Sequence, residues 1–391
     1  MNFKGYRRED GSIGIRNKTL IIAVDECCDG IARNISEKVK DSVVLTNSYT
    51  CMLGGNEETF NQMIAVGKNP NVGGVLVIAM GCGSILPEQI AEPIAKIGKP
   101  VDILTCQKNG GTRRTIETGI QKLKTISEEI NKTPREDVSI AELIVGVKCG
   151  GSDTSSGMAS NPSAGNAIDK LIDAGGIGIG GELFELQGCQ ENLRKRAVSE
   201  EVFNKIDSLI EAEKSRWSVE GTNVETMSIG NSVGGLTTIE EKSLGALYKM
   251  GTKPIKDILE INKDFIDKPK ESGFYLSETT MLCGGAGVNF ASLGAQMVLW
   301  TSGAAGFNNP IIPVIRISGN EDLFNDDMDI DARGIMDGSD TVDNVGNNII
   351  KKIVEIANGE KTQLEDIGSA TLTLYQKDQR LEQLLGSCKN K

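Results

Sequence analysis

The sequence contains no histidine among its 391 residues. Histidine is the side chain that most often acts as a general base near pH 7. Proton transfer by this chain therefore has to use Lys, Asp, Glu, Cys or Tyr, or a residue of another chain. Aromatic residues make up only 4% of the sequence, which predicts cores built from aliphatic side chains. No run approaches the ~20 apolar residues of a membrane-spanning helix, so we expect no membrane segment.

Several ligand-binding signatures are absent as well. The nine cysteines form no CxxC pair, which argues against a zinc ribbon or a ferredoxin-type cluster. No GxGxxG follows the first predicted strand and no P-loop is present, so nothing predicts nucleotide binding. The net charge of −12 argues against a nucleic-acid partner. The N-terminus lacks the apolar core of a signal peptide, so we expect a cytoplasmic protein with reduced thiols.

Short apolar runs alternate with helical patterns along the first third of the chain. These runs occupy residues 20–24, 42–46, 74–80 and 101–105. The alternation predicts an α/β fold, and the length suits two doubly wound, Rossmann-like domains with mainly parallel sheets. A polar stretch with Pro134 marks the boundary. We therefore predict an N-terminal domain at 1–135 and a C-terminal domain at 136–391, with an insertion near 218–275.

The segment from Lys148 to Gly165 has the richest chemistry in the sequence. It reads KCGGSDTSSGMASNPSAG and directly follows an apolar run. Its glycines allow the backbone to approach a ligand closely. Asn161 and Pro162 fit the cap and first position of a helix, whose free N–H groups favour an anion. The segment predicts a site for a small anionic substrate; the alternative is a glycine-rich turn with ordinary capping.

Cysteines recur near the carboxyl ends of the predicted strands. Those cysteines are Cys27, Cys28, Cys51, Cys82, Cys106 and Cys149. Ligands of open α/β sheets bind outside these strand ends, so one or two of the thiols are expected to line a site or hold a metal. The alternative is that each free cysteine is a small buried hydrophobe.

Two further motifs carry charged side chains beside glycines. GGTRRT at 110–115 places Arg113 in the first turn of a helix, where it opposes the helix dipole unless an anion is bound. The alternative is a solvated arginine pair. GLTTIEEKS at 235–243 contains Lys242 with two glutamates, which suits either general acid–base chemistry or a helix start with favourable acidic residues.

Taken together, the motifs resemble the family of altronate and galactarate dehydratases and the large subunit of sulfolactate sulfo-lyase. The similarity runs through residues 5–17, 81–83, 110–115, 148–165, 181–188, 234–251 and 300–306. It covers most of the chain. It implies a metal-dependent lyase, usually with Fe(II), that catalyses β-elimination from a sugar acid or related 2-hydroxy acid such as altronate. The developing enolate needs stabilisation by a metal or by cations.

The resemblance also guides the assignment of site residues. We place catalytic roles on Lys148, Lys242 and Asp153, with one of the two lysines as the base because burial or a nearby cation can lower a lysine pKa. Substrate contacts are assigned to Arg16, Asn17, Arg113, Ser152, Ser156, Asn161 and Thr301. Metal ligands are assigned to Cys82, Cys149 and Glu182.

The sequence departs from the family pattern in two places. Fused members carry a small histidine-containing domain before the GYRREDG motif, which here begins at Gly5. This implies a separate small subunit that carries histidines; a homo-oligomer also stays open. Ala304 and Ala305 stand where the dehydratases commonly have an arginine, which keeps open a sulfolactate sulfo-lyase large subunit. An iron–sulfur hydro-lyase and a non-catalytic subunit are also compatible with the sequence.

Overall fold

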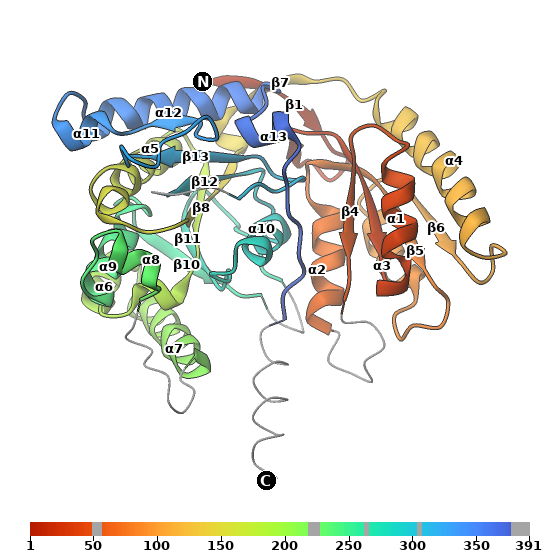
Figure 1. Ribbon diagram of the computed structural model, residues 1–391, viewed down its shortest axis with the longest axis horizontal. Coiled ribbons are helices and arrows are strands. Elements are labelled where there is room, and N and C mark those ends of the chain that lie inside the picture. The colour runs from red at the N-terminus through yellow and green to blue at the C-terminus, as the bar shows by residue number, and fades with distance from the viewer. Residues whose placement is uncertain (49–56, 218–226, 262–265, 303–306, 377–391) are drawn as a thin grey trace, which may run out of the picture.

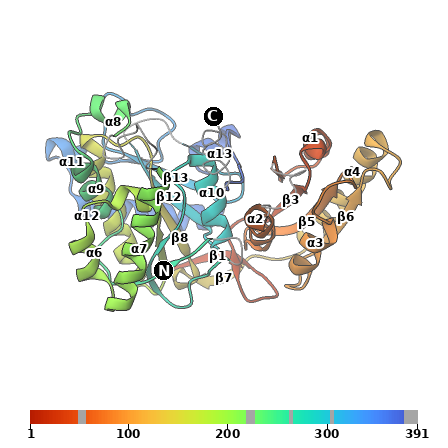
Figure 2. The same cartoon turned by 90° about the horizontal axis from the view of Figure 1, so that it is seen from below.

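The computed structural model describes residues 1–48, 57–217, 227–261, 266–302 and 307–376. It shows two lobes side by side, each built around a parallel sheet (Figures 1 and 2). The N-terminal sheet has the order β4-β3-β5-β6. Its strands are β3 (Lys18–Ala23), β4 (Ser42–Thr46), β5 (Val72–Ala79) and β6 (Val101–Thr105). Its helices are α1 (Asp29–Ser36), α2 (Glu57–Lys68), α3 (Pro87–Ala95) and α4 (Thr112–Ile130).

The C-terminal sheet has seven strands in the order β10-β11-β9-β8-β12-β13-β14, and every neighbouring pair is parallel. Its strands are β8 (Ile144–Cys149), β9 (Ile177–Gly180), β10 (Ile255–Leu259), β11 (Gly273–Ser277), β12 (Met297–Thr301), β13 (Val314–Ser318) and β14 (Ile330–Asp331). Both sheets are parallel and both carry helices, which confirms the predicted α/β class with Rossmann-like domains.

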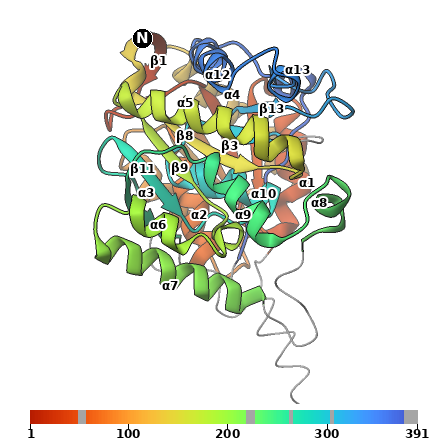
Figure 3. The same ribbon diagram turned by 90° about the vertical axis from the view of Figure 1, so that its left-hand side faces the viewer.

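Helices cover both faces of the seven-stranded sheet. One face packs against α5 (Asn161–Asp173) and α12 (Val342–Ala357), with α6 (Gln190–Arg196), α7 (Glu200–Trp217) and α9 (Ile239–Tyr248) on the same side of the lobe (Figure 3). On the opposite face, α10 (Cys283–Ser292) lies between the sheet and α2 of the N-terminal lobe (Figure 1). The shorter helices are α8 (Ile229–Val233), α11 (Gly334–Asp337) and α13 (Gln363–Ile367).

One hydrophobic cluster runs through both lobes. Met63 and Val66 of α2 belong to the same buried cluster as Phe290 of α10 and Trp300 of β12. Burial of a continuous apolar surface holds the two lobes in one arrangement. Among the described residues, no helix is long and apolar enough to span a bilayer.

The first residues of the chain pack with the second lobe. A small antiparallel sheet joins β1 (Asn2–Arg7) to β2 (Ile13–Gly14) and β7 (Glu136–Ser139). Phe3, Ile13 and Ile15 enter the buried cluster of the C-terminal sheet. These residues fall in the predicted N-terminal domain, yet their side chains contribute to the core of the C-terminal lobe. The reason is that β1 pairs with residues 136–139, which are far away in sequence.

The segment near 218–275 differs from the predicted insertion. It supplies β10 and most of β11, which are the two outermost strands on one side of the seven-stranded sheet. Ile255, Ile258 and Phe274 are fully buried in the main core. The described part of this segment therefore belongs to the domain itself. Its irregular sequence hid two short strands that only the sheet stabilises.

Candidate active site

The loop after β8 leads into a helix that begins earlier than predicted. A π-helical turn, Ser156–Ser160, precedes α5 without a break, and the backbone N–H of Asn161 donates to the carbonyl of Ser156. The side-chain amide of Asn161 donates to the carbonyl of Gly245 at 2.9 Å. Asn161 is therefore not the helix cap, and the prediction of free N–H groups at this residue is wrong.

Asp153 occupies the place of the helix cap. Its Oδ1 accepts hydrogen bonds from the backbone N–H of Ser156 and from the hydroxyl of Ser155, each at 2.7 Å. Its Oδ2 accepts from the side chain of Asn320 at 2.7 Å. Ser156 completes the turn, since its hydroxyl donates to the Asp153 carbonyl at 2.7 Å. The carboxylate of the protein itself thus already satisfies the helix start.

Five charged side chains meet beside this loop, and we call them the lysine–glutamate cluster. Its members are Lys148, Glu182, Glu185, Lys242 and Lys249. Lys148 lies on β8, the two glutamates follow β9, and the remaining lysines come from α9 and the residue after it. At least 85% of each side chain is shielded from solvent. The strand ends and α9 therefore bring Lys249 to two glutamates that lie 67 and 64 residues away in sequence.

The ion pairs of the cluster form a continuous chain. Glu182 pairs through Oε1 with Lys148 and through Oε2 with Lys249, the latter at 2.8 Å. Glu185 pairs with Lys249 at 3.1 Å and with Lys242 at 2.9 Å. Lys242 also donates to Asn231 at 3.0 Å. Three cations share two carboxylates, so the five linked groups carry one net positive charge.

The backbone of Glu182 is strained. Its φ of 63° and ψ of 54° lie in the left-handed region that non-glycine residues rarely adopt. Its carboxylate also accepts the backbone N–H of Cys149 at 2.8 Å, and its own N–H donates to Thr279. Such conformations persist where surrounding contacts overdetermine them, and they concentrate at functional sites.

The buried charges shift one another's pKa values in a consistent direction. Burial alone raises the pKa of Glu185, but Lys249, Lys242 and Lys148 outweigh burial and hold it well below its usual range. Burial alone lowers the pKa of Lys249, but the two glutamates raise it above its usual value. The pKa of Lys242 is raised in the same way, chiefly by Glu185. The prediction of a lysine base assumed that burial or a nearby cation lowers the lysine pKa; the direction found for Lys242 and Lys249 is the opposite.

Cys149 and Ser152 connect the loop to the cluster. The Cys149 thiol lies 2.8 Å from the Ser152 hydroxyl, and the Ser152 carbonyl accepts from Asn231 at 2.9 Å. Asn231 in turn contacts Lys242, so the loop and the cluster form one hydrogen-bonded unit. The Thr301 hydroxyl lies 3.4 Å from the Lys148 carbonyl. The structure thus gathers most of the predicted residues of the loop and of the strand ends.

The three predicted metal ligands do not gather at one site, although Cys149 and Glu182 are neighbours. Cys82 is exposed in the N-terminal lobe, and both oxygens of Glu182 are taken by lysines. Burial and then Glu185 raise the pKa of Cys149 to about 11, which disfavours its thiolate form. In the described part of the chain, no three His, Cys, Asp or Glu side chains are arranged to hold a metal ion. These residues do not fit a metal centre.

Three predicted substrate contacts lie elsewhere. Arg16 makes a buried ion pair with Glu365 at 2.9 Å and donates to the carbonyls of Ile356 and Glu360. Asn17 bridges Arg8 and the Ile130 carbonyl. Both line a cleft of about 580 Å³. Arg113 is exposed at the start of α4 in the N-terminal lobe.

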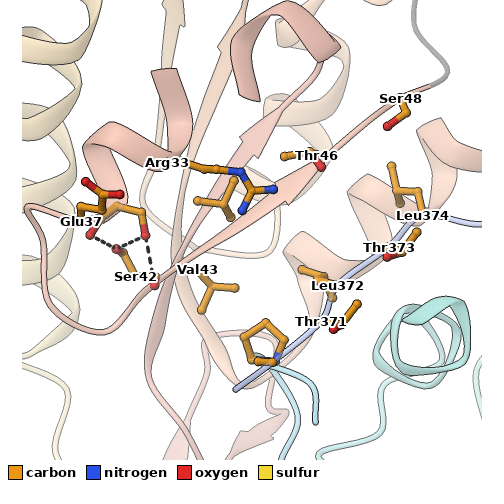
Figure 4. Close-up of a pocket in the computed structure, with 14 residues that line it drawn as sticks. Arg33, Glu37, Ser42, Val43, Thr46, Ser48, Thr371, Leu372, Thr373 and Leu374 are labelled. Atoms are coloured by element: carbon orange, nitrogen blue, oxygen red, sulfur yellow. Dashed lines mark hydrogen bonds between the residues drawn. The ribbon is translucent and has the colours of Figure 1, made fainter. Parts of the chain in front are cut away.

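A larger cleft of about 720 Å³ separates β4 from residues 370–374 (Figure 4). Its lining includes Arg33 together with the hydroxyls of Ser42, Thr46 and Thr371. Arg33 is paired with Asp29 at 2.8 Å, and none of the residues assigned to the site from sequence lines this cleft. We therefore place the candidate active site at the lysine–glutamate cluster.

Sequence reasoning missed three residues of the site: Glu185, Lys249 and Trp300. Lys249 lies seven residues after Lys242, a spacing that places both on one side of a helix, and Glu185 lies three residues after Glu182. That spacing was visible in the sequence. The contact of Trp300 with Lys148 was not, because it depends on the pairing of β8 with β12.

Comparison with known proteins supports the motif-based resemblance. The family described as D-galactarate/Altronate dehydratase, C-terminal, matches residues 140–379, and the D-galactarate dehydratase/Altronate hydrolase second domain matches residues 5–131. An altronate dehydratase of Bacillus subtilis is 31% identical over 95% of this chain and 77% of its own length.

Two further relatives match most of the chain. The (2R)-sulfolactate sulfo-lyase subunit beta of Chromohalobacter salexigens is 29% identical over 95% of this chain and 96% of its own length. A galactarate dehydratase (L-threo-forming) of Escherichia coli is 28% identical over 93% of this chain and 74% of its own length. The chain belongs to the D-galactarate/altronate dehydratase family.

Proposed function

We propose that this protein is a sugar-acid dehydratase subunit that removes water from a 2-hydroxy acid such as altronate by β-elimination. The observation that carries the proposal is the buried lysine–glutamate cluster, with its net positive charge, beside the loop after β8. A substrate carboxylate would neutralise that charge. Relatives named altronate and galactarate dehydratase support the substrate class.

The cluster suits the stabilisation of a developing enolate. Loss of the proton next to a carboxylate places further negative charge on its oxygens, and fixed cations in a water-excluded site stabilise that charge. Lys148 and Lys249 are held in place by Glu182. They act as preorganised cations in this scheme, in the role that a metal ion plays in other lyases.

Lys242 is the proton donor of the proposed reaction. Its side chain, 15% exposed, is the most accessible of the cluster lysines. Its pKa is raised, so it is loaded with a proton at neutral pH. Lys242 protonates the β-hydroxyl as the C–O bond breaks, and water leaves. The enol product then tautomerises to a 2-keto acid.

The base that takes the α-proton comes from a second polypeptide in this proposal. The chain has no histidine, and the carboxylates and lysines of the cluster are engaged with one another. One relative is named as a subunit, which supports a multi-subunit enzyme. A small histidine-bearing subunit is the partner we propose.

The test is turnover of altronate by the purified chain, alone and with a candidate small subunit, followed by 2-keto acid release. We expect full activity only with the partner. Full activity of the isolated chain would overturn the two-subunit proposal, and no activity on any sugar acid in either state would overturn the dehydratase proposal. Parallel assays with added Fe(II), with a chelator and with acid-labile sulfide analysis test the metal dependence predicted from the resemblance.

A carbon–sulfur lyase is the second candidate. The (2R)-sulfolactate sulfo-lyase subunit beta is 29% identical to this chain, close to the 28–31% of the dehydratases, which supports this alternative. The same cluster would stabilise the enolate while sulfite leaves in place of water. Sulfite release from sulfolactate, measured beside keto acid release from altronate, separates the two reactions.

A further inference from the structure

The indole ring of Trp300 lies beneath the ammonium group of Lys148. The two residues are directly paired across the parallel strands β12 and β8, so their side chains project from the same face of the sheet. The Lys148 Nζ is 5.0 Å from the ring centroid. This is within the range of a cation–π interaction, and tryptophan is the strongest aromatic partner for it.

The surroundings of Lys148 match the geometry of an ammonium group. An ammonium has three N–H donors and no acceptor. Two of its contacts are acceptors, the carboxylate of Glu182 and the carbonyl of Cys149 at 3.0 Å, and the third is the electron-rich face of the indole. A neutral amine would place a lone pair among these groups with no donor to meet it.

Other charged groups around this pair come from several elements. Glu185 follows β9, and Lys242 and Lys249 belong to the α9 region; all three are linked to Lys148 through the lysine–glutamate cluster. On the other side of Trp300, Arg316 of β13 is its register partner. Trp300 therefore lies between strands that carry Lys148 and a fully buried arginine.

The position of the indole is fixed by its neighbours. A Cβ at Gly150 would overlap the indole Nε1, and the ring of Phe307 packs against Trp300 at a centroid distance of 5.2 Å. The buried Nε1–H has no hydrogen-bond partner among the described residues. An unpaired buried donor is unfavourable, so hydrogen bonding does not explain a tryptophan here. The contact between the ring face and Lys148 explains the tryptophan at this position.

We propose that Trp300 is a positioning residue that holds Lys148 as a fixed ammonium in the candidate active site. The inference rests on the proposed function for its catalytic consequence: Lys148 binds the substrate carboxylate and does not serve as the base. Its physical part, the dependence of the Lys148 position on the aromatic ring, is independent of which substrate the enzyme uses.

Two variants of Trp300 separate the ring face from the N–H group. Trp300→Phe keeps an aromatic face and removes Nε1–H, whereas Trp300→Leu removes both. Phe290→Leu is the matched control, because Phe290 is fully buried in the same hydrophobic cluster and reports the effect of lost packing alone. Circular dichroism and thermal unfolding first establish that the variants are folded.

The direct readout is NMR of lysine labelled with ¹³C at Cε, with the Lys148 signal assigned from Lys148→Arg. We expect the Lys148 signal to report one fixed environment in the wild type and in Trp300→Phe, and to move toward the signal of a freely rotating lysine in Trp300→Leu. Phe290→Leu is expected to leave it unchanged. The same signal in Trp300→Leu and the wild type would overturn the proposal. This measurement needs no substrate, so it stands even if the proposed activity fails.

The kinetic readout uses the assembled enzyme on its active substrate. We expect Trp300→Leu to lower kcat/KM by about 30-fold, the value of a desolvated cation–π contact. We expect the kcat/KM of Trp300→Phe to stay within about threefold of the wild-type value. If Trp300→Phe loses as much as Trp300→Leu, the N–H group matters and the ring-face argument is wrong. If Trp300→Leu matches Phe290→Leu in kcat/KM and in the Lys148 signal, Trp300 serves packing alone.

Discussion

Replacing Glu182 by glutamine removes the one carboxylate that Lys148 and Lys249 share. Three lysines would then depend on Glu185, and the net charge of the cluster would rise from one positive charge to two. Removing one partner of a buried ion pair costs about 3–5 kcal/mol. Glu182 has two lysine partners, and its side chain is only 1% exposed. We therefore expect Glu182→Gln to lower the free energy of unfolding by about 4–5 kcal/mol, the upper end of this range.

Lys249→Met provides the comparison. It removes a fully buried cation but leaves Lys148 with Glu182 and Lys242 with Glu185, so the four remaining groups are balanced. We expect a smaller loss, about 3 kcal/mol. Lys351→Met is the surface control: Lys351 is 78% exposed and 3.8 Å from Glu355, and such pairs contribute about 0–1 kcal/mol.

The assay is urea unfolding at pH 7 and at pH 9.5, with the free energy of unfolding extrapolated to water. In the wild type, the raised pKa of Lys249 means that its stabilising charge is present below the unfolded value of about 10.4 and is lost only as pH rises through the folded value. In Glu182→Gln that pKa falls, and a lysine can lose its proton near pH 9.5. The difference in free energy of unfolding between the wild type and Glu182→Gln should therefore be smaller at pH 9.5 than at pH 7.

The ranking of the three variants decides the argument. We expect Glu182→Gln to be less stable than Lys249→Met, and Lys351→Met to match the wild type. Glu182→Gln could instead lower the free energy of unfolding by less than about 1 kcal/mol, or by the same amount at both pH values. Either result would show that solvent screens the cluster and would refute the prediction from burial.

The remaining predictions concern the loop, the proton donor and the thiols. Gly150→Ala should destabilise the fold and lower activity, since its Cβ would overlap Trp300; wild-type melting and kinetics would contradict the close approach. Lys242→Met should lower kcat by about 10²–10⁴ with little change in KM, and an unchanged kcat would exclude it as the proton donor. At pH 8 a maleimide should modify the exposed Cys82 before Cys28, because burial and then Asp25 raise the pKa of Cys28 to about 12; mass spectrometry of the peptides gives the order.

The alternation of apolar runs and helical patterns was sufficient to predict the fold class. A strand such as 74–80 is apolar at almost every position, which is typical of a parallel sheet covered on both faces. The two strands within 218–275 escaped notice because short strands carry little local signal and form only against the existing sheet.

Local sequence also identified much of the candidate site. The loop from Lys148 and the motif around Lys242 contain two of the five residues of the lysine–glutamate cluster, and Glu182 was recognised as a third, although as a metal ligand. The cap assigned to Asn161 failed because Asp153, eight residues earlier, competes for the helix start. Residue type predicts which residues are able to cap a helix, whereas the path of the chain determines which of them does so.

Tertiary structure alone decided how these groups are paired. Nothing local to Lys148 specifies that its ammonium meets Glu182 and rests on Trp300, residues 34 and 152 positions away. Strand order and register set those contacts, and they also set the charge of the site, because a buried charge depends on the partners that surround it. The sequence by itself determined the fold class, the family and the acid–base residue types. The assembled sheet decided which of those residues meet, and therefore what chemistry they can perform.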